Sequence, residues 1–457
     1  MSNEIIITDK SNIVAIADAV RSKTGSTVPM NLGGIVNGIN GIQVGSGSFS
    51  PAPPVEEKDV NFYDYDGTLL YSYTIEEAHA LTELPQLPSH DGLVCQGWNW
   101  TLAQVKAIPK AANVGAAYIT DDGKTRLYLE WGQDKYRTLT IHFTQTVANG
   151  VTIDWGDGSP TETVSGTGAV TATHNFVQSN CVMTLLPTGS CKMTLGRTSS
   201  ELNLFDEKSG KSMVVSSVLK KVEVGQDVTA LNQHCFFYCH SLETLTIPLG
   251  VTMGAGCIRE SSVKCMINTD TSGWMLPQQM AQGSSVEVVS LPPNIITIGI
   301  YAFYNARKLE NANFVANLEG INNAGLSGTQ SLKTVKFHDS VTTIPSEFIA
   351  YSSRITQMTL PPNLTTITAN AFIADNNIAQ LEIPTSVTSI GASAFAQMYA
   401  LGYLKFLPTT PPTVANANAF TGIPTTCVVE VPKGTLATYQ AATNYSGIAA
   451  QMVEVDE

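Results

Sequence analysis

The chain has 457 residues, a net charge of −13 and a pI near 5.0, so it lacks the positive charge that binding nucleic-acid phosphates or an anionic membrane requires. Charged residues make up only 14% of the chain, and Thr, Ser, Asn and Gly supply much of its polarity, as is typical of exposed β-structure. A chain of this length predicts about two to four domains.

Neither terminus shows a membrane or secretion signal. The first 25 residues carry charges from Glu4 to Arg21 and contain no uninterrupted apolar stretch, so we expect no signal peptide. No segment reaches the roughly 18 apolar residues of a membrane span, and Val453–Glu457 offers no hydrophobic tail. We therefore expect no membrane insertion.

Residues 1–45 predict a short helical module. Ser11 can cap a helix whose apolar residues form one stripe ending near Gly25, and a second, glycine-weakened stripe follows from Leu32 to Ile42. About 40 residues cannot normally fold alone. The module is therefore expected to attach the chain to another protein, to oligomerise it with a trimer favoured, or to cover the next domain.

Residues 46–57 are rich in Gly, Ser and Pro and predict a linker. Residues 58–135 predict a small mixed α/β domain. Within it, Asn61–Tyr73 predicts a hairpin that turns at Asp66-Gly67, Ile75–Leu81 predicts a helical patch, and Ile119–Trp131 repeats the strand–Asp-Gly–strand pattern.

Residues 136–215 alternate between apolar and polar with period two and predict a β-sandwich. Strands are expected at Leu139–Phe143, Val151–Trp155 and Val182–Leu186.

Residues 216–457 contain a repeat, which predicts a solenoid. Seven of its eight steps are 23 residues long and one, from 242 to 263, is 21. The nine coils begin at Leu219, Leu242, Val263, Val286, Leu309, Leu332, Ile355, Ile378 and Leu401. Such a regular stack favours a recognition surface over an enzyme.

Apolar residues occupy fixed places in each coil. Positions 4 and 6 face one way on a short strand that a proline often ends, a second ridge follows at positions 10 and 13, and an Ala-Phe pair such as Ala394-Phe395 stands at positions 17 and 18. The coil at 263–285 departs from this pattern with Asn268, Trp274 and Pro277, which predicts a bulge or an inserted loop. Val428–Pro432 and a helix at Leu436–Ala442 predict a C-terminal cap.

None of the eight cysteines lies in a CxxC pair, so most are expected to be buried thiols. A bridge between Cys181 and Cys191, across a hairpin, is the exception to test. The seven histidines show no metal-binding spacing, and His174 and His234 are expected in the core or in turns. We expect no metal and no cofactor.

The coil Ile378–Phe395 resembles the BspA-like leucine-rich repeats of bacterial surface proteins, a resemblance that covers about half the chain. It implies a right-handed solenoid used for adhesion and names no ligand. Residues Val151–Gly158, with Thr173–Phe176, resemble a PKD-type immunoglobulin-like domain, which implies a spacer. Asp154 and Asp157 lie close enough in sequence to suggest calcium, but a turn closed by Asp157-Gly158 explains them more simply.

Segments near the N-terminus are similar to tail proteins of phages and prophages of Gram-positive bacteria. They are Ile16–Gly25, Phe62–Thr68, Ser89–Leu93, Gln96–Trp100 and Tyr118–Arg126. This resemblance implies a virion fibre that attaches to other tail or baseplate proteins through its N-terminus.

Two enzyme hypotheses compete with recognition. Asp64–Leu69 resembles the DxDGT signature of haloacid-dehalogenase-type phosphatases, in which the first Asp attacks phosphorus. That chemistry needs a large Rossmann-like sheet, whereas the segment before Asp64 does not look like a buried parallel strand, so an Asp-Gly hairpin is preferred. Paired carboxylates of a glycan depolymerase would leave no sequence signature.

We therefore predict a mainly β, non-catalytic receptor-binding protein. The preferred interpretation is an oligomeric phage tail fibre, located in the virion, with residues 58–215 as spacer and a solenoid that binds a bacterial glycan or protein receptor. The alternative is a bacterial cell-surface adhesin. Trp274, Tyr399 and Tyr403 are candidate exposed aromatics, and the receptor-binding residues are not assigned.

Overall fold

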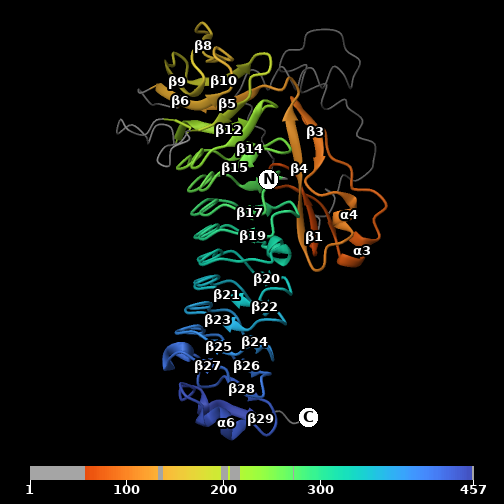
Figure 1. The fold of residues 1–457 in the computed structure, drawn as a ribbon, viewed down its shortest axis with the longest axis vertical. Helices are drawn as coiled ribbons and strands as arrows, with labels where there is room; N and C mark the ends of the chain where they lie inside the picture. Colours follow the sequence, from red (N-terminus) through yellow and green to blue (C-terminus); the bar gives the residue numbers. More distant parts are fainter. Residues whose placement is uncertain (1–56, 132–136, 197–203, 206–216, 271, 455–457) are drawn as a thin grey trace, which may run out of the picture. The chain divides into compact units, whose positions relative to one another are not determined.

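The computed structural model describes residues 57–131, 137–196, 204–205, 217–270 and 272–454. All of them belong to the second of two compact units, Val55–Glu457, and the predicted helical module at 1–45 lies outside them. The described part is mainly β, and its C-terminal half is a β-solenoid of stacked coils (Figure 1).

The first domain is a four-stranded sheet in the order β2-β1-β4-β3 with two short helices. Thr74 and Thr101 each begin a helix with a capping box, in which the threonine side chain and a Glu or Gln three residues later satisfy free N–H groups. The elements are β1 (Val60–Tyr63), β2 (Leu69–Tyr73), α3 (Ile75–His79), β3 (Leu93–Trp98), α4 (Leu102–Val105) and β4 (Ala112–Thr120).

The predicted hairpin is confirmed, because β1 pairs antiparallel with β2, and the helical patch is confirmed as α3. The description of the segment before Asp64 was wrong, since β1 is fully buried and pairs parallel with β4. The second segment has the predicted strand–Asp-Gly–strand order, with a turn at Asp122-Gly123, but its two strands do not pair as a hairpin. Its strands β4 and β5 (Thr125–Glu130) join different sheets.

A two-sheet sandwich follows, and the three expected strands are present in it as β6, β7 and β10. Its core contains Trp155, which is fully buried. Besides β5, its strands are β6 (Thr138–Gln145), β7 (Val151–Asp154), β8 (Glu162–Val164), β9 (Gly168–Asn175), β10 (Asn180–Pro187) and β11 (Met193–Leu195).

The sandwich sheets continue directly into the solenoid. In one sheet, β12 (Leu219–Glu223) pairs antiparallel with β5, and in the other, β13 (Val228–Leu231) pairs parallel with β11. One hydrophobic core runs through both parts. The predicted boundaries at 135/136 and 215/216 therefore do not separate the sheets: the sandwich includes β5, and it covers the strand edges that the first coil would otherwise expose.

Two parallel ladders run along the solenoid, and most coils add one short strand to each, whereas the coil from Leu309 adds a strand to neither. The first ladder contains β14 (Thr244–Thr246), β16 (Cys265–Ile267), β18 (Val288–Ser290), β20 (Thr334–Lys336), β22 (Gln357–Thr359), β24 (Gln380–Ile383), β26 (Tyr403–Phe406), β28 (Val428–Val431) and β29 (Met452–Glu454). The second contains β15 (Thr252–Met253), β17 (Met275–Leu276), β19 (Thr297–Ile298), β21 (Thr343–Ile344), β23 (Thr366–Ile367), β25 (Ser389–Ile390) and β27 (Thr413–Val414).

A third ladder of hydrogen bonds runs along the corner that carries the Ala-Phe pair. In the coil around Phe303, the N–H groups of Tyr301, Phe303 and Asn305 donate to carbonyls of the next coil. Tyr301 and Asn305, which are four residues apart, adopt the left-handed conformation with positive φ. This conformation directs alternate N–H groups of the corner toward the next coil. The same pair of positive φ angles recurs from coil to coil, so the corner is as regular as the strands.

The C-terminal end terminates this ladder. The 3-10 helix η2 (Ala417–Phe420) occupies the corner, and the N–H groups of Ala419 and Thr421 bond within that turn instead of to a further coil. The short helix α6 (Leu436–Ala441) and η3 (Ala449–Gln451) lie beside β29. The predicted cap at Val428–Ala442 is confirmed in β28 and α6.

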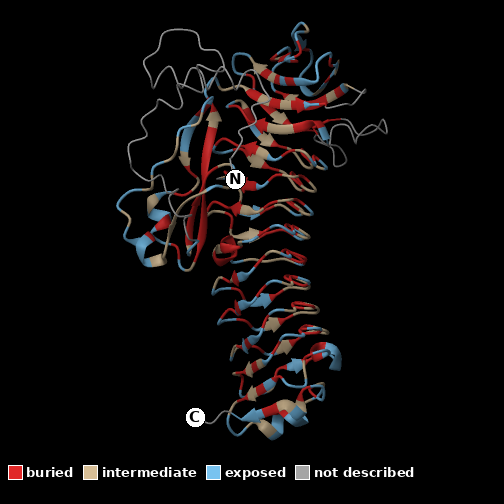
Figure 2. Ribbon diagram, turned by 180° about the vertical axis from the view of Figure 1, so that it is seen from behind, coloured by how far each residue is buried: buried red, intermediate tan, exposed pale blue. Residues whose placement is uncertain are grey.

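The inward positions are buried as the repeat pattern predicts, and Figure 2 shows buried residues lining the inside of the coils. Phenylalanines of successive coils stack on one another, with ring centroids of Phe372 and Phe395 5.5 Å apart and nearly parallel planes. This column explains why the Ala-Phe pair recurs: the alanine leaves room at the corner, and the aromatic ring fills the centre.

Candidate recognition surface

The first domain covers part of the first-strand ladder instead of extending away from it as a spacer. Strand β4 contacts β14, β16, β18 and the 3-10 helix η1 (Asn313–Asn317), and it is buried along nearly its whole length (Figures 1 and 2). Gly115 of β4 lies against Ile267, where a Cβ would stand only 2.6 Å from the isoleucine side chain. Glycine therefore permits the close approach of the two strands.

Side-chain amides and an indole supply the central polar contacts of this docked face. Trp100 Nε1–H donates to the Leu291 carbonyl at 2.8 Å, and Asn113 Nδ2–H donates to the Val289 carbonyl at 3.0 Å. Asn99 Nδ2–H reaches the Asn268 carbonyl at 3.0 Å. These bonds satisfy backbone carbonyls of the ladder that the domain removes from water.

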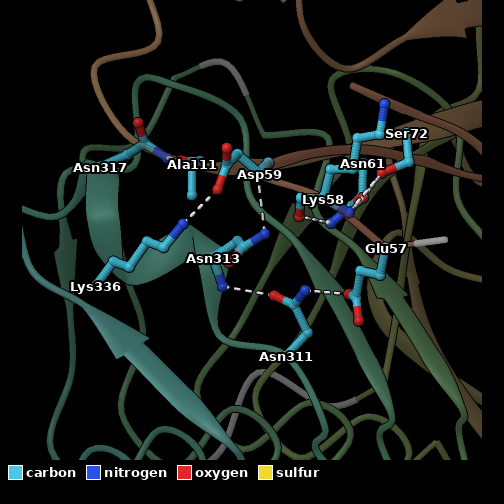
Figure 3. A network of polar contacts seen from close by, with 10 residues as sticks. All are labelled: Glu57, Lys58, Asp59, Asn61, Ser72, Ala111, Asn311, Asn313, Asn317 and Lys336. Carbon is cyan, nitrogen blue, oxygen red and sulfur yellow. Dashed lines mark hydrogen bonds and ion pairs between the residues drawn. The ribbon is translucent and has the colours of Figure 1, made fainter. Parts of the chain in front are cut away.

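A second network lies around η1 (Figure 3). Asn313 Nδ2–H donates to the Asp59 carbonyl at 3.0 Å, and Asn317 Nδ2–H donates to the Ala111 carbonyl at 2.8 Å. Lys336 pairs with the Asp59 carboxylate, and Asn311 donates to Glu57. The solenoid thus contributes three asparagines from one coil together with Lys336, and the domain contributes two backbone carbonyls and two carboxylates.

Two irregular coils contact the domain, beside the regular coils that supply Val289, Leu291 and Lys336. In the coil from Leu309, η1 replaces the strand of the first ladder and presents the asparagines. In the coil from Val263, Cys265 of β16 pairs with Val288, 23 residues later, as the repeat requires, but Leu276 of β17 pairs with Ile298, only 22 residues later. The predicted irregularity is therefore one extra residue between β16 and β17. The departures from the repeat carried a signal for an intramolecular interface that the sequence analysis missed.

The later coils leave the first ladder exposed. Its outward charges alternate in register, with Glu382 beside Lys405 and Lys405 beside Glu430. Such opposite-sign neighbours stabilise a sheet modestly and leave little net charge on it. Tyr403 lies half-buried on this same ladder, so of the three candidate aromatics it is the least accessible.

The other two candidates are exposed, Trp274 at 61% and Tyr399 at 60%. Trp274 follows a loop that Asp270 Oδ1 holds through the N–H groups of Ser272 and Gly273. Further exposed tyrosines stand on the third-ladder corner, namely Tyr238, Tyr301 and Tyr351. The aromatic side chains are therefore distributed along the solenoid and do not form one cluster in the described residues.

The DxDGT segment forms the turn between β1 and β2. Gly67 N–H donates to the Asp64 carbonyl, and Asp66 Oδ1 accepts from Thr68 N–H. The Asp64 carboxylate is buried and bonds His90 Nε2 at 2.8 Å. Tyr118, whose pKa is raised by burial and by Asp64, closes this cluster, so the carboxylate is used in a structural contact.

In the sandwich, Asp157 accepts hydrogen bonds from His174, from Val177 N–H and from Ser159 N–H. Burial alone would raise the pKa of Asp157, but these bonds outweigh it and hold the pKa well below its usual range. The His174 ring stacks on Trp155 with centroids 4.6 Å apart. Asp157, one of the two carboxylates considered for calcium, is thus hydrogen-bonded by the protein itself, and His174 is partly buried against the core residue Trp155.

Seven of the eight cysteines are buried and Cys95 is exposed, and all eight are free thiols. The bridge considered between Cys181 and Cys191 is therefore absent. Within the described ranges, no group of three or more His, Cys, Asp or Glu side chains is arranged to hold a metal ion. No helix in the same residues is long and apolar enough to cross a membrane.

Residues 206–271 and 276–402 match the BspA type Leucine rich repeat region in six copies. This stretch of the solenoid therefore has the pattern of BspA-type leucine-rich repeats. No curated protein sequence matches the chain.

Among solved structures, the chain is similar to a leucine-rich repeat protein from Eubacterium ventriosum, with 18% identity and a TM-score of 0.33 over 52% of this chain and 66% of that one. It is also similar to a leucine rich cell surface protein from Faecalibacterium prausnitzii, with 18% identity and a TM-score of 0.28 over 46% of this chain and 60% of that one. The pneumococcal vaccine antigen PcpA has 12% identity and a TM-score of 0.34, over 52% and 68% of the two chains. The first two structures are each covered over less than two thirds of their length.

Proposed function

We propose that this chain is a non-catalytic adhesion protein whose leucine-rich-repeat solenoid binds a glycan or protein receptor on a bacterial surface. The observation that carries the proposal is the match of the solenoid to BspA-type repeats in six copies. The geometry supports it, because three ladders hold the outward side chains of successive coils in fixed rows. A rigid surface binds at a smaller entropic cost than one that must first be ordered.

The repeats favour a bacterial cell-surface adhesin as the setting of this function. BspA-like repeats are those of bacterial surface proteins, and the expected ligand of such a protein is a host or bacterial surface component.

A phage tail fibre is the second candidate, and a specific observation favours it. Four of the segments similar to tail proteins lie within 57–131, and all of them except the end of the last, which enters β5, belong to the domain that docks on the solenoid. In this case residues 1–45 would bind tail or baseplate proteins and trimerise the chain, and the virion would carry the solenoid to its host. The two candidates share the adhesion function and differ in the particle that displays it.

Binding is tested with full-length, fluorescently labelled protein added to bacterial cells and to their isolated wall glycans. We expect saturable binding that unlabelled protein displaces, and none by an unrelated protein of similar net charge. An absence of saturable binding to every surface tested would overturn the adhesion proposal. Release of new reducing ends from the bound glycans would instead show a depolymerase.

Immunogold labelling separates the two settings. Gold on the surface of producing cells would support the adhesin, and gold on released virions would support the tail fibre. Each result excludes the other as the principal location.

A further inference from the structure

A hollow of about 460 Å³ lies on the corner of three consecutive coils. Its walls are Glu260, Gln282, Asn305, Arg307 and Lys308, with Gly283 between them. This volume falls within the roughly 300–1,000 Å³ of typical small-ligand sites. The hydrogen bonds that fix the first domain to the solenoid involve other residues, such as Leu291 and Asn313, so in the described part of the chain they leave the hollow uncovered.

The hollow lies at one of two glycines in a regular column. The column is formed by the second left-handed residue of each coil and contains Tyr238, Glu260, Gly283, Asn305, Gly328, Tyr351, Ala374 and Gln397. Gly283 interrupts this column between two polar side chains, and a Cβ there would lie 3.1 Å from Glu260 Cγ. Most coils carry a side chain at this position with the same positive φ angle, so the backbone conformation alone does not require glycine at position 283. The glycine leaves the space between Glu260 and Asn305 open.

The charges around the hollow favour an anion. Arg307 is exposed and makes no ion pair among the described residues. Lys308 Nζ lies 4.0 Å from Glu287 Oε1, which is a long and weak ion pair. On the opposite wall, Glu260 is 3.9 Å from Arg259. Two weakly engaged cations therefore face one carboxylate, on a chain whose net charge is −13.

The polar groups beneath these charges can bind hydroxyls. The Oε1 atom of Gln282 is buried and accepts no hydrogen bond from the described residues. Ser284 is buried and donates its hydroxyl hydrogen to the Ala281 carbonyl, so it offers no group to a ligand. A ligand with several hydroxyls would supply a donor to the Gln282 amide at the wall of the hollow, and glycans carry such groups at every sugar.

We propose that this hollow binds an anionic unit of a surface glycan, a sugar or polyol that bears a carboxylate or a phosphodiester. Arg307 and Lys308 hold the anion, and Gln282, Asn305 and Glu260 bind the hydroxyls. The inference rests on the proposed adhesion function and deepens it by naming a site and a ligand class. Carboxylate and phosphodiester glycans present the same chemistry here, a single negative charge on a hydroxyl-rich chain.

Calorimetric titration of the full-length protein tests the site with three probes: oligogalacturonate, poly(glycerol phosphate) oligomers and neutral dextran oligomers. We expect one or both anionic probes to bind, the affinity to fall as salt rises, and dextran not to bind. The probe that binds identifies the carboxylate or the phosphodiester as the natural anion. Equal binding of dextran, or no binding of either anionic probe, would overturn the proposal.

Two variants place the binding in the hollow. Gly283→Asn fills the gap with a side chain that Asn305 already carries in the same conformation, and Arg307→Ala removes the free cation; each should weaken binding at least tenfold. Tyr351→Asn, in the same column but another coil, and Arg354→Ala, an exposed arginine elsewhere on the corner, should bind as wild type. If wild-type protein adheres to cells and both hollow variants adhere equally well, this site is wrong while the adhesion function stands.

Discussion

Trp100 and Leu291 are 191 positions apart in the chain, yet the indole N–H of the first donates to the backbone carbonyl of the second across 2.8 Å. Both residues are buried. The bond fixes the small domain to the end of β18, and the amides of Asn99 and Asn113 repeat the arrangement on either side. The solenoid between Leu242 and Lys336 is therefore stabilised from outside as well as by its own core.

Trp100→Phe should lower the free energy of unfolding by about 1–3 kcal/mol, because it keeps most of the ring but leaves the buried Leu291 carbonyl without a donor. Denaturant unfolding measures the loss, and hydrogen exchange should show faster exchange in β18. Trp98→Phe is the matched control, since the Trp98 indole bonds Pro85 within the domain. If the control accelerates exchange in β18 as much as Trp100→Phe does, the indole bond does not hold the interface.

Amides rather than ions should dominate the second network. Asn313→Ala removes the donor to the Asp59 carbonyl at a nearly buried site and should cost about 1–3 kcal/mol. Asp59→Asn breaks the ion pair with Lys336, but both side chains are more than a third exposed, so the expected cost is below about 1 kcal/mol. Thermal unfolding at low and high salt measures both effects, and a larger loss for Asp59→Asn than for Asn313→Ala would contradict this assignment.

The repeat made the solenoid predictable because each coil buries the same positions, so apolar residues such as Val387 and Ile390 reveal their contacts by spacing alone. The turns at Asp66-Gly67 and after Asp157 were equally readable, since their hydrogen bonds are local. The docked domain was not predictable in this way. Its contacts join residues about 200 positions apart and depend on the backbone carbonyls of the solenoid, which every sequence possesses.

The hollow escaped prediction for a related reason. It is defined by the absence of a side chain at Gly283, and its walls come from three coils that only the stacking brings together. The third ladder was also invisible, because left-handed residues such as Glu347 and Tyr351 are not of the types that favour that conformation. Tertiary hydrogen bonds impose it, and the local sequence gives no sign of it.

Several residues with a side chain on the third ladder adopt a positive φ that is less unfavourable for glycine, so replacing one of them by glycine should stabilise the protein. Ser393 has a φ of 53°, so Ser393→Gly should stabilise the protein by about 0.5–1 kcal/mol once the entropic cost of glycine is subtracted. Ser389→Gly, four residues earlier in β25, should destabilise it by a similar amount, because an extended residue gains nothing from glycine. Opposite signs in denaturant unfolding are the expected result, and destabilisation by both would show that Ser393 is unstrained.

Asp375 should make the solenoid less stable as pH rises. It is completely buried; Oδ1 accepts from Ser352 N–H, and Oδ2 has no partner among the described residues. Burial raises the pKa of Asp375 well above its ordinary value, and the Ser352 bond offsets only part of this. The folded protein therefore keeps the proton that the unfolded chain releases above about pH 3.9, so the stability contributed by this group is complete at lower pH and declines as pH increases toward the folded pKa.

Asp375→Asn keeps the Oδ1 acceptor and removes the titration. Relative to wild type, the variant should gain stability as the pH rises from 4 to 8, because only the wild-type protein must keep a proton that its unfolded chain releases. Groups of opposite sign contribute equally to both proteins, so the difference in stability at each pH removes their effect. Asp157 is such a group: its pKa is depressed in the folded protein, so the stability that it contributes is present above the ordinary carboxyl pKa and is lost on acidification. A pH-independent difference between Asp375→Asn and wild type would contradict the prediction, because it would mean that Asp375 ionises in the folded protein.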